Sequence, residues 1–77
     1  LAEDYRIMEI DAPPKTHGRS LAALDLRSKF DILILAVKNP EDPHFRFLPP
    51  ADKVIRQGEI LMVLGRELDL VRFANYD

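Results

Sequence analysis

The chain has 77 residues, a length that corresponds to one small domain. Hydrophobic residues make up 47% of it and charged residues 31%, which is the composition of a globular protein and not of a disordered one. The net charge is −2 and the Lys and Arg residues are scattered, so we expect no nucleic-acid partner. The absence of cysteine excludes disulfides, thiolate metal sites and cysteine catalysis, and it fits a reducing compartment.

No segment of the sequence is suited to enter a membrane directly. The longest uninterrupted apolar run covers residues 32–37, which is far too short to cross a bilayer. The N-terminal Leu-Ala-Glu-Asp has neither the charged region nor the apolar region of a signal peptide. Because the chain starts without Met, we expect residues 1–77 to be one domain excised from a longer protein. A domain this small buries little surface, so we expect a partner to add stability.

The first third of the chain predicts a strand followed by a helix. Residues 5–11 hold aromatic and β-branched side chains in partial alternation, and the strand must end before the prolines at 13–14 because proline cannot donate to a β-ladder. Gly18 marks a turn, and Ser20 is suited to cap a following helix. Leucines at helical spacing predict about two turns over residues 21–27.

The middle of the chain predicts two strands around a loop. Residues 31–38 form a continuous apolar run bounded by polar residues, which predicts a strand buried on both faces. Two prolines make residues 39–43 a loop. Residues 44–48 predict a short strand in which Phe45 and Phe47 point to one side and belong to the core.

The last third predicts a strand and a helix. Residues 51–58 form a polar connector that ends in a tight turn at its glycine. Residues 59–64 predict another apolar strand, ended by Gly65, and residues 66–76 have the spacing of an amphipathic helix. The simplest packing of these elements is a small α+β domain, with a mixed or antiparallel sheet and two short helices on one face.

We find no catalytic or metal-binding pattern. Neither serine, Ser20 or Ser28, lies in a strand–turn–helix elbow, and the isolated glycines make no phosphate-binding loop. The only histidines, His17 and His44, have no ligand spacing that predicts a metal site. We therefore expect a domain that is not an enzyme and that holds no cofactor or metal.

Three segments in a fixed order resemble a known family. They are Gly-Arg-Ser-Leu-Ala-Ala-Leu-Asp-Leu-Arg at 18–27, Phe-Leu-Pro-Pro-Ala-Asp-Lys-Val-Ile at 47–55 and Gln-Gly-Glu-Ile-Leu-Met-Val-Leu-Gly at 57–65. Each segment alone is common, but the ordered set is more specific. Over about residues 8–73 the chain resembles the TrkA-C domain, the C-terminal subdomain of RCK (regulator of potassium conductance) proteins.

The resemblance implies a function that the residues alone do not show. It implies a cytoplasmic regulatory, ligand-sensing domain that forms a homodimer and is attached to a nucleotide-binding Rossmann subdomain. Such a domain gates ion transport by a potassium or other cation channel or transporter. The alternatives are a purely structural dimerisation module without ligand, a cyclic di-AMP sensor, or the regulatory domain of a cation–proton antiporter or an anion transporter.

The resemblance also implies a ligand site, because some relatives bind cyclic di-AMP at the dimer interface. Carried over by motif position, the candidate residues are Leu21, Arg27, Lys29, Leu33 and Pro49. Arg27 can pair bidentately with a phosphate, and Leu21 and Pro49 can flank an adenine. Leu33 departs from the pattern, because ligand-binding relatives tend to carry an Asn there that can hydrogen-bond the nucleotide.

Simpler interpretations of the same residues stay open. Asp31 replaces a common Gly and puts a negative charge near the expected phosphate position, which disfavours an anionic ligand. Arg27 follows a short helix, where a cation stabilises the last carbonyl groups. Leu21 and Leu24 can be core residues, and the apolar strand at 32–37 can be core or dimer seam.

Overall fold

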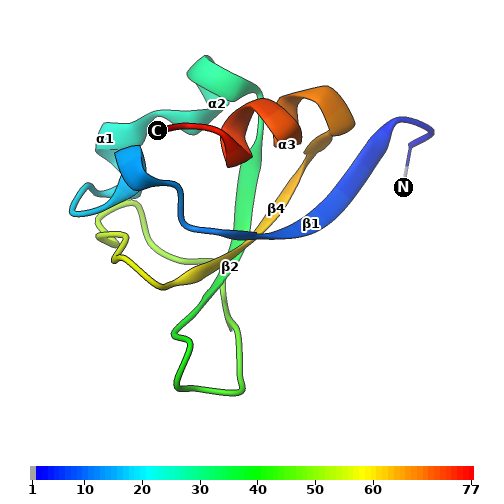
Figure 1. Ribbon diagram of the computed structural model, residues 1–77. Coiled ribbons are helices and arrows are strands. Elements are labelled where there is room, and N and C mark those ends of the chain that lie inside the picture. The colour runs from blue at the N-terminus through cyan, green and yellow to red at the C-terminus, as the bar shows by residue number, and fades with distance from the viewer. Residues whose placement is uncertain (1) are drawn as a thin grey trace.

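The computed structural model describes residues 2–77 and shows one sheet with helices packed on one of its faces (Figure 1). The strands are β1 (Tyr5–Asp11), β2 (Leu33–Lys38), β3 (Arg46–Phe47) and β4 (Ile60–Arg66), in the spatial order β1-β4-β2-β3. Every neighbouring pair is antiparallel. The α+β class and the antiparallel sheet that the sequence predicts are confirmed.

The helices are short. They are α1 (Leu21–Leu24), α2 (Leu26–Phe30) and α3 (Glu67–Ala74), with a 3-10 turn, η1 (Pro14–Thr16), after β1. The sequence predicts one helix over residues 21–27, but the structure has two, because Asp25 adopts a left-handed conformation with φ of 49° between them. Asp tolerates this conformation better than most residues, and the break lets Leu24 and Leu26 both reach the core.

Ser20 begins α1 as the sequence predicts. Its backbone is extended, and its Oγ accepts a hydrogen bond from the Ala23 N–H at 3.1 Å. This bond satisfies one of the N–H groups that the first turn of a helix leaves without a partner. The cap therefore fixes where the chain turns into α1.

The helices cover only one face of the sheet, and the core lies between them. Along β4, Leu61 and Val63 face the helices and are fully buried, whereas the intervening Met62 and Leu64 are half-buried. This alternation follows from the two-residue repeat of a strand. The core cluster consists of Ile10, Ala12, Leu24, Leu26, Phe30, Ile32, Val37, Ile55, Leu61, Val63, Leu70 and Phe73.

The other face of the sheet, here called the open face, has no covering layer. Pairing in the sheet sets Leu33 beside Leu64 and Leu64 beside Ile7, so these three side chains share that face. Leu33 is 50% exposed and Ile7 is 47% exposed. The prediction that residues 31–38 are buried on both faces is therefore wrong for this chain by itself, since the helices protect one face only.

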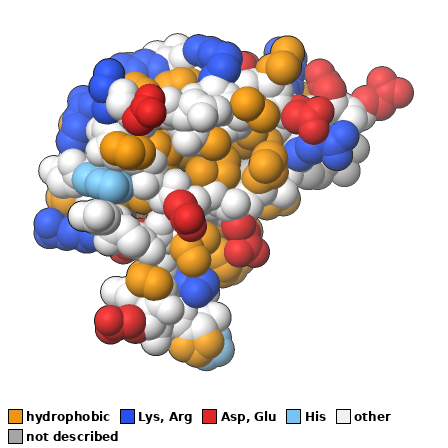
Figure 2. Space-filling view, viewed as in Figure 1, with side chains coloured by type: hydrophobic (Ala, Val, Ile, Leu, Met, Phe, Trp, Pro, Cys, Tyr) orange, Lys and Arg blue, Asp and Glu red, His pale blue; other side chains and the backbone are white. Residues whose placement is uncertain are grey.

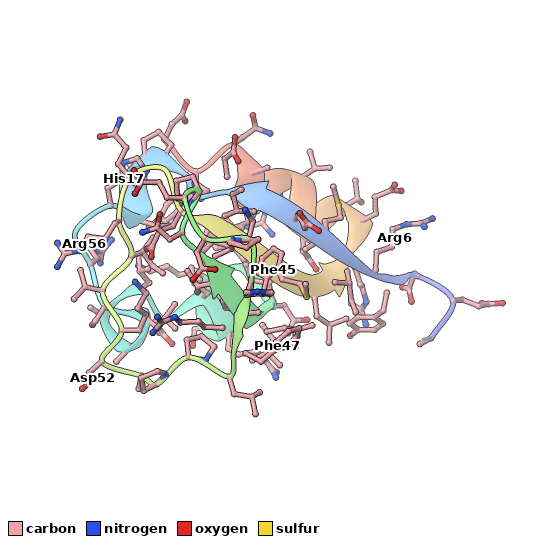
Figure 3. The ribbon with its side chains drawn as sticks, turned by 90° about the horizontal axis from the view of Figure 1, so that it is seen from below. Arg6, His17, Phe45, Phe47, Asp52 and Arg56 are labelled. Carbon is pink, nitrogen blue, oxygen red and sulfur yellow. The ribbon has the colours of Figure 1, made fainter. Side chains whose placement is uncertain are left out.

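The short strand near residue 46 is an edge strand that extends beyond the helices. The sequence predicts a strand over residues 44–48, but only Arg46 and Phe47 pair with β2. The prediction that Phe47 belongs to the core is wrong, because its side chain is 63% exposed; Phe45 is only half-buried. Both lie on the β2–β3 hairpin, which projects from the sheet in Figure 1, and Figure 3 shows Arg6 to one side of them.

Gly65 lies inside β4 and does not end it, contrary to the sequence prediction. A Cβ atom at this position would come within 2.8 Å of Ile32 Cγ2 and 3.4 Å of Leu70 Cδ2. Glycine therefore serves the close approach of Ile32 to β4, and not a turn. The strand continues to Arg66, and α3 begins at the next residue.

Candidate functional site

Four of the five predicted ligand residues meet at one shallow recess beside the outer edge of β2. Leu21 from α1, Arg27 from α2, Leu33 from β2 and Pro49 from the loop after β3 line a hollow of about 340 Å³. The sequence separates these residues, and the fold brings them together. The remaining lining residues are Ala22, Asp25, Leu26, Ile32, Ile34 and Ala51.

Lys29, the fifth predicted residue, is not part of this recess. It follows Arg27 by two positions on α2, and two helical residues differ in direction by about 200°. The Lys29 carbonyl oxygen instead accepts a hydrogen bond from Arg72 Nη2 of α3 at 3.5 Å. The structure therefore leaves Lys29 outside the recess, with its backbone in contact with α3.

The wall of the recess is held by backbone hydrogen bonds between α1 and the loop after β3. The Leu21 N–H donates to the Lys53 carbonyl at 3.0 Å, and the Ala22 N–H donates to the Ala51 carbonyl at 2.8 Å. A helix leaves its first N–H groups without internal partners, so the loop satisfies them. Leu21 and Ala51 are thus fixed relative to each other before any ligand arrives.

The charges in the recess are mixed. Arg27 is the only cation among the lining residues, and its Nε lies 3.5 Å from Asp31 Oδ1, one helical turn further on. Asp25 adds a second carboxylate to the lining. Both partners of the ion pair are more than half exposed, so water weakens it and leaves the guanidinium free to exchange partners.

The floor of the recess is apolar. Leu33 is 50% exposed and offers a bound molecule contact area but no side-chain hydrogen bond. Leu21 and Pro49, which also line the recess, are half-buried. The site can therefore hold a planar apolar group between hydrophobic walls while Arg27 meets a negative group at the rim.

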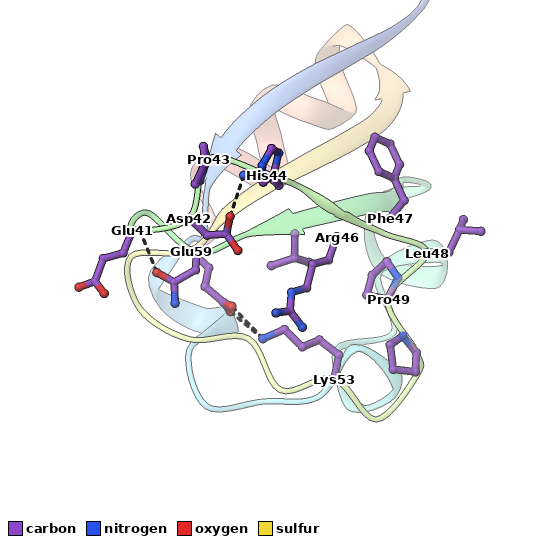
Figure 4. Close-up of a pocket in the computed structure, with 13 residues that line it drawn as sticks. Glu41, Asp42, Pro43, His44, Arg46, Phe47, Leu48, Pro49, Lys53 and Glu59 are labelled. Atoms are coloured by element: carbon purple, nitrogen blue, oxygen red, sulfur yellow. Dashed lines mark hydrogen bonds and ion pairs between the residues drawn. The ribbon is translucent and has the colours of Figure 1, made fainter.

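A second hollow, of about 750 Å³, lies under the β2–β3 hairpin (Figure 4). Its centre is the ion pair between Lys53 and the buried Glu59, with Nζ–Oε distances of 2.8 and 3.1 Å. The Arg56 N–H also donates to Glu59 Oε1 at 2.7 Å. Arg46 points toward this pair from β3 (Figure 4).

Sequence reasoning missed this ion pair because it treated residues 51–58 as a polar connector. The signal was a lysine and a glutamate on either side of a tight turn at Gly58, which has φ of 89°. The turn brings Glu59 back to Lys53, and the pair fixes the connector. The Lys53 carbonyl also accepts the hydrogen bond from Leu21, so the ion pair helps to position a residue that lines the recess.

Two polar side chains at the hairpin tip have local roles. Asp42 Oδ1 accepts from the His44 N–H at 2.9 Å, and Asn39 Oδ1 accepts from the Glu41 N–H at 3.0 Å, as side chains do in turns. Among residues 2–77, no three His, Asp or Glu side chains gather where they could hold a metal ion. Over the same residues, no helix is long and apolar enough to span a membrane.

Comparison with known families now identifies the fold. Residues 5–76 match the TrkA-C domain. The chain belongs to the TrkA-C family. This match confirms the resemblance drawn from the ordered segments. The matched residues include those of the recess and of the β2–β3 hairpin.

Two relatives of this TrkA-C domain are potassium uptake proteins of Bacillus subtilis (strain 168). It is 32% identical over 75 residues to the Ktr system potassium uptake protein A, covering 97% of this chain and 33% of the relative. It is 37% identical over 73 residues to the Ktr system potassium uptake protein C, covering 95% and 32%. The chain thus spans about a third of the length of these relatives.

Solved structures share the same architecture. The RCK C domain of the potassium transport protein KtrA, in complex with cyclic di-AMP, superposes on this TrkA-C domain with a TM-score of 0.85 and 32% identity, covering 100% of this chain and 88% of that one. The RCK_C domain dimer of S. agalactiae BusR, also in complex with cyclic di-AMP, gives 0.75 at 22% identity, covering 95% and 94%. The second likeness shows the fold alone.

Proposed function

We propose that this TrkA-C domain is a cytoplasmic regulatory domain of a potassium or other cation transport system, and that it senses a small ligand at a two-fold dimer interface. The matching KtrA domain is named for potassium transport and for cyclic di-AMP, and the likeness spans this whole chain. In the longer parent protein, the domain is joined to a nucleotide-binding subdomain that acts on a membrane channel or transporter.

The observation that carries the proposal is the recess. Leu21, Arg27, Leu33 and Pro49 come from separated segments and line one hollow with a cation at its rim. A recess of about 340 Å³ is small for a dinucleotide, which suits a site completed by a second copy. Across a two-fold axis, two such recesses would present two Arg27 side chains to two phosphates.

The regulatory step follows from differential binding. A ligand held between two recesses stabilises only the arrangement of protomers in which both Arg27 side chains reach it. A ligand with equal affinity for two arrangements would not shift the equilibrium between them. The backbone hydrogen bond between Leu21 and Lys53 links the recess to the connector after β3, so a change at the recess can reach the rest of the domain.

Calorimetric titration tests the ligand-sensing role. Cyclic di-AMP is titrated into the domain, with ATP and AMP as further probes, and we expect one ligand per dimer. Arg27→Ala should weaken binding about tenfold or more, because it removes a charge-assisted hydrogen bond from each protomer. Arg56→Ala, an exposed arginine outside the recess, is the matched control and should bind as the wild type does.

A second candidate function is a dimerisation module without ligand. Two observations favour it: Leu33 makes the floor of the recess unable to hydrogen-bond, and Asp31 competes with a phosphate for Arg27. Flat titrations from a protein that light scattering shows to be a dimer would replace the sensing role by this one. A strict monomer at high concentration would contradict both.

A further inference from the structure

Leu48 is held in a conformation and an environment that are both unfavourable for the isolated chain. Its side chain is 82% exposed, and its φ of 55° lies in the left-handed region, where the Cβ atom of an L-residue is strained. Its N–H donates to the Leu35 carbonyl at 2.8 Å, so the sheet imposes this backbone. Strain that persists at an exposed apolar residue indicates a contact that is made elsewhere.

Leu48 is not alone. The preceding Phe47 is 63% exposed and, by its pairing with Ala36, lies on the open face. Both residues line the hollow around the Lys53–Glu59 pair, and their side chains point away from that pair (Figure 4). We call Phe47 and Leu48 the hydrophobic ridge.

The ridge is continuous with the ligand recess. Pro49, the residue after the ridge, lines that recess, and Leu33 belongs both to the recess and to the open face. The ridge and the recess therefore belong to one continuous surface. The second copy of the chain that completes the recess can also cover the ridge.

The sequence around the ridge favours a second copy of the chain over a partner of opposite charge. Residues 47–51, Phe-Leu-Pro-Pro-Ala, carry no charge, and neither does Leu33 beside them. A two-fold axis brings a surface against its own copy, so charged groups close to the axis would meet their like. An uncharged apolar ridge is self-complementary in this respect.

We propose that the hydrophobic ridge anchors a dimer of this domain, with Phe47 and Leu48 of each protomer packed on the open face of the partner beside Leu33. The inference rests on the dimer of the proposed function and adds the side chains that hold it. A few exposed apolar residues seated on a partner carry most of the binding energy of an interface.

A second exposed apolar area supplies the control. On α3, Leu68 is 79% exposed, and Val71 is 47% exposed. Figure 2 shows hydrophobic side chains gathered near α3 and β1, with charged side chains around the edge of this face. The backbone at Leu68 is regular helix, and ion pairs such as Arg6–Glu67 lie next to it, so neither strain nor neutrality points to a second copy there.

Two substitutions of Leu48 separate strain from contact. Leu48→Gly removes the side chain and relieves the strain, because glycine adopts a positive φ freely. Leu48→Ala removes most of the side chain but keeps a Cβ atom in the strained conformation. Leu68→Ala removes an apolar side chain of the same size from the helix surface and is the matched control. The dissociation constant of the dimer is measured by analytical ultracentrifugation, and stability by urea unfolding at several protein concentrations.

We expect both Leu48 variants to raise the dissociation constant of the dimer at least about tenfold, and Leu68→Ala to leave it unchanged. At low concentration Leu48→Gly should unfold at a urea concentration equal to or above that of the wild type. Its midpoint should also lose the rise with protein concentration that a dimer shows. Leu48→Gly would then weaken association without weakening folding. If Leu48 only stabilised the fold of the monomer, the substitution would lower the stability of the monomer as well.

The outcomes are distinguishable. A dimer whose dissociation constant is the same in Leu48→Gly and the wild type overturns the ridge and leaves the proposed function intact. A wild-type chain that stays monomeric overturns both. Weaker association in Leu68→Ala and not in the Leu48 variants would place the contact on α3 instead and also overturn the proposal.

Discussion

Glu59 shows how one side chain can fix a connector that has no regular structure. It is the only charged residue buried among residues 2–77, and each of its two carboxylate oxygens accepts hydrogen bonds. A buried charge is tolerated only when it is paired and hydrogen-bonded. Because Lys53 holds Glu59 with its side chain and Leu21 with its carbonyl, this pair connects the inside of the hairpin hollow with the ligand recess.

We expect Glu59→Gln to lower the free energy of unfolding by about 1–3 kcal/mol, because it leaves Lys53 without its counter-charge. The free energy is measured by urea unfolding. Asp4→Asn is the control: it breaks an exposed pair with Arg66, at 3.3 Å, and should change stability by about 0.5 kcal/mol or less. Equal stabilities for the wild type and Glu59→Gln would show that the pair is not needed for the fold.

At the scale of elements, α1 and α2 are too short to be stable by themselves. Helices of one turn have few internal hydrogen bonds, so their stability comes from caps and packing. Ser20 caps α1, the loop at 51–55 satisfies its first N–H groups, and Leu24 is fully buried beneath it. Leu21 stands at the first position of this helix, so the cap also positions a wall of the recess.

Ser20→Ala should therefore affect both stability and the recess. We expect a loss of about 1 kcal/mol in the free energy of unfolding, because the Ala23 N–H loses its acceptor. Ligand affinity, measured by the titration proposed above, should fall in the same variant. Ser28→Ala is the matched control, since Ser28 is exposed in α2 and Ala favours helix. Ser20→Ala with unchanged stability would mean that the loop alone fixes the start of α1.

At the scale of the whole molecule, the dominant feature is a sheet covered on one face only. An antiparallel sheet can expose one face to water when that face is polar. Here the exposed face carries Ile7, Leu33, Met62, Leu64 and Phe47. Glu9 and Asp11 of β1 lie at one side of this face, and the apolar residues gather toward β2 and β3. Exposed apolar surface of this kind marks an interaction site.

Leu33→Asp tests this at the level of assembly. Leu33 is half exposed, so the monomer should keep its fold, which circular dichroism checks. In a two-fold contact each carboxylate would be desolvated near its copy, so we expect a monomer by light scattering at concentrations where the wild type is a dimer. Leu68→Asp on α3 should remain a dimer. A dimer that tolerates Leu33→Asp would use a different surface.

The sequence by itself determined the α+β class, the positions of β1 and β4, the cap at Ser20 and the membership of the TrkA-C family. These depend on local patterns: alternation in strands, a capping residue before leucines, and an ordered set of motifs. It also named Leu21, Arg27, Leu33 and Pro49, which the fold brings to one recess. What that recess binds stays a prediction.

Only the tertiary structure decided which apolar residues are covered. A strand of uniformly apolar side chains looks buried on both faces, yet the helices of this chain suffice for one, so Leu33 and Phe47 are exposed. The role of Gly65 likewise depended on how closely Ile32 and Leu70 approach it. Whether a residue is buried depends on the segments that pack against it. Those segments are distant in the sequence, so a local pattern does not show them.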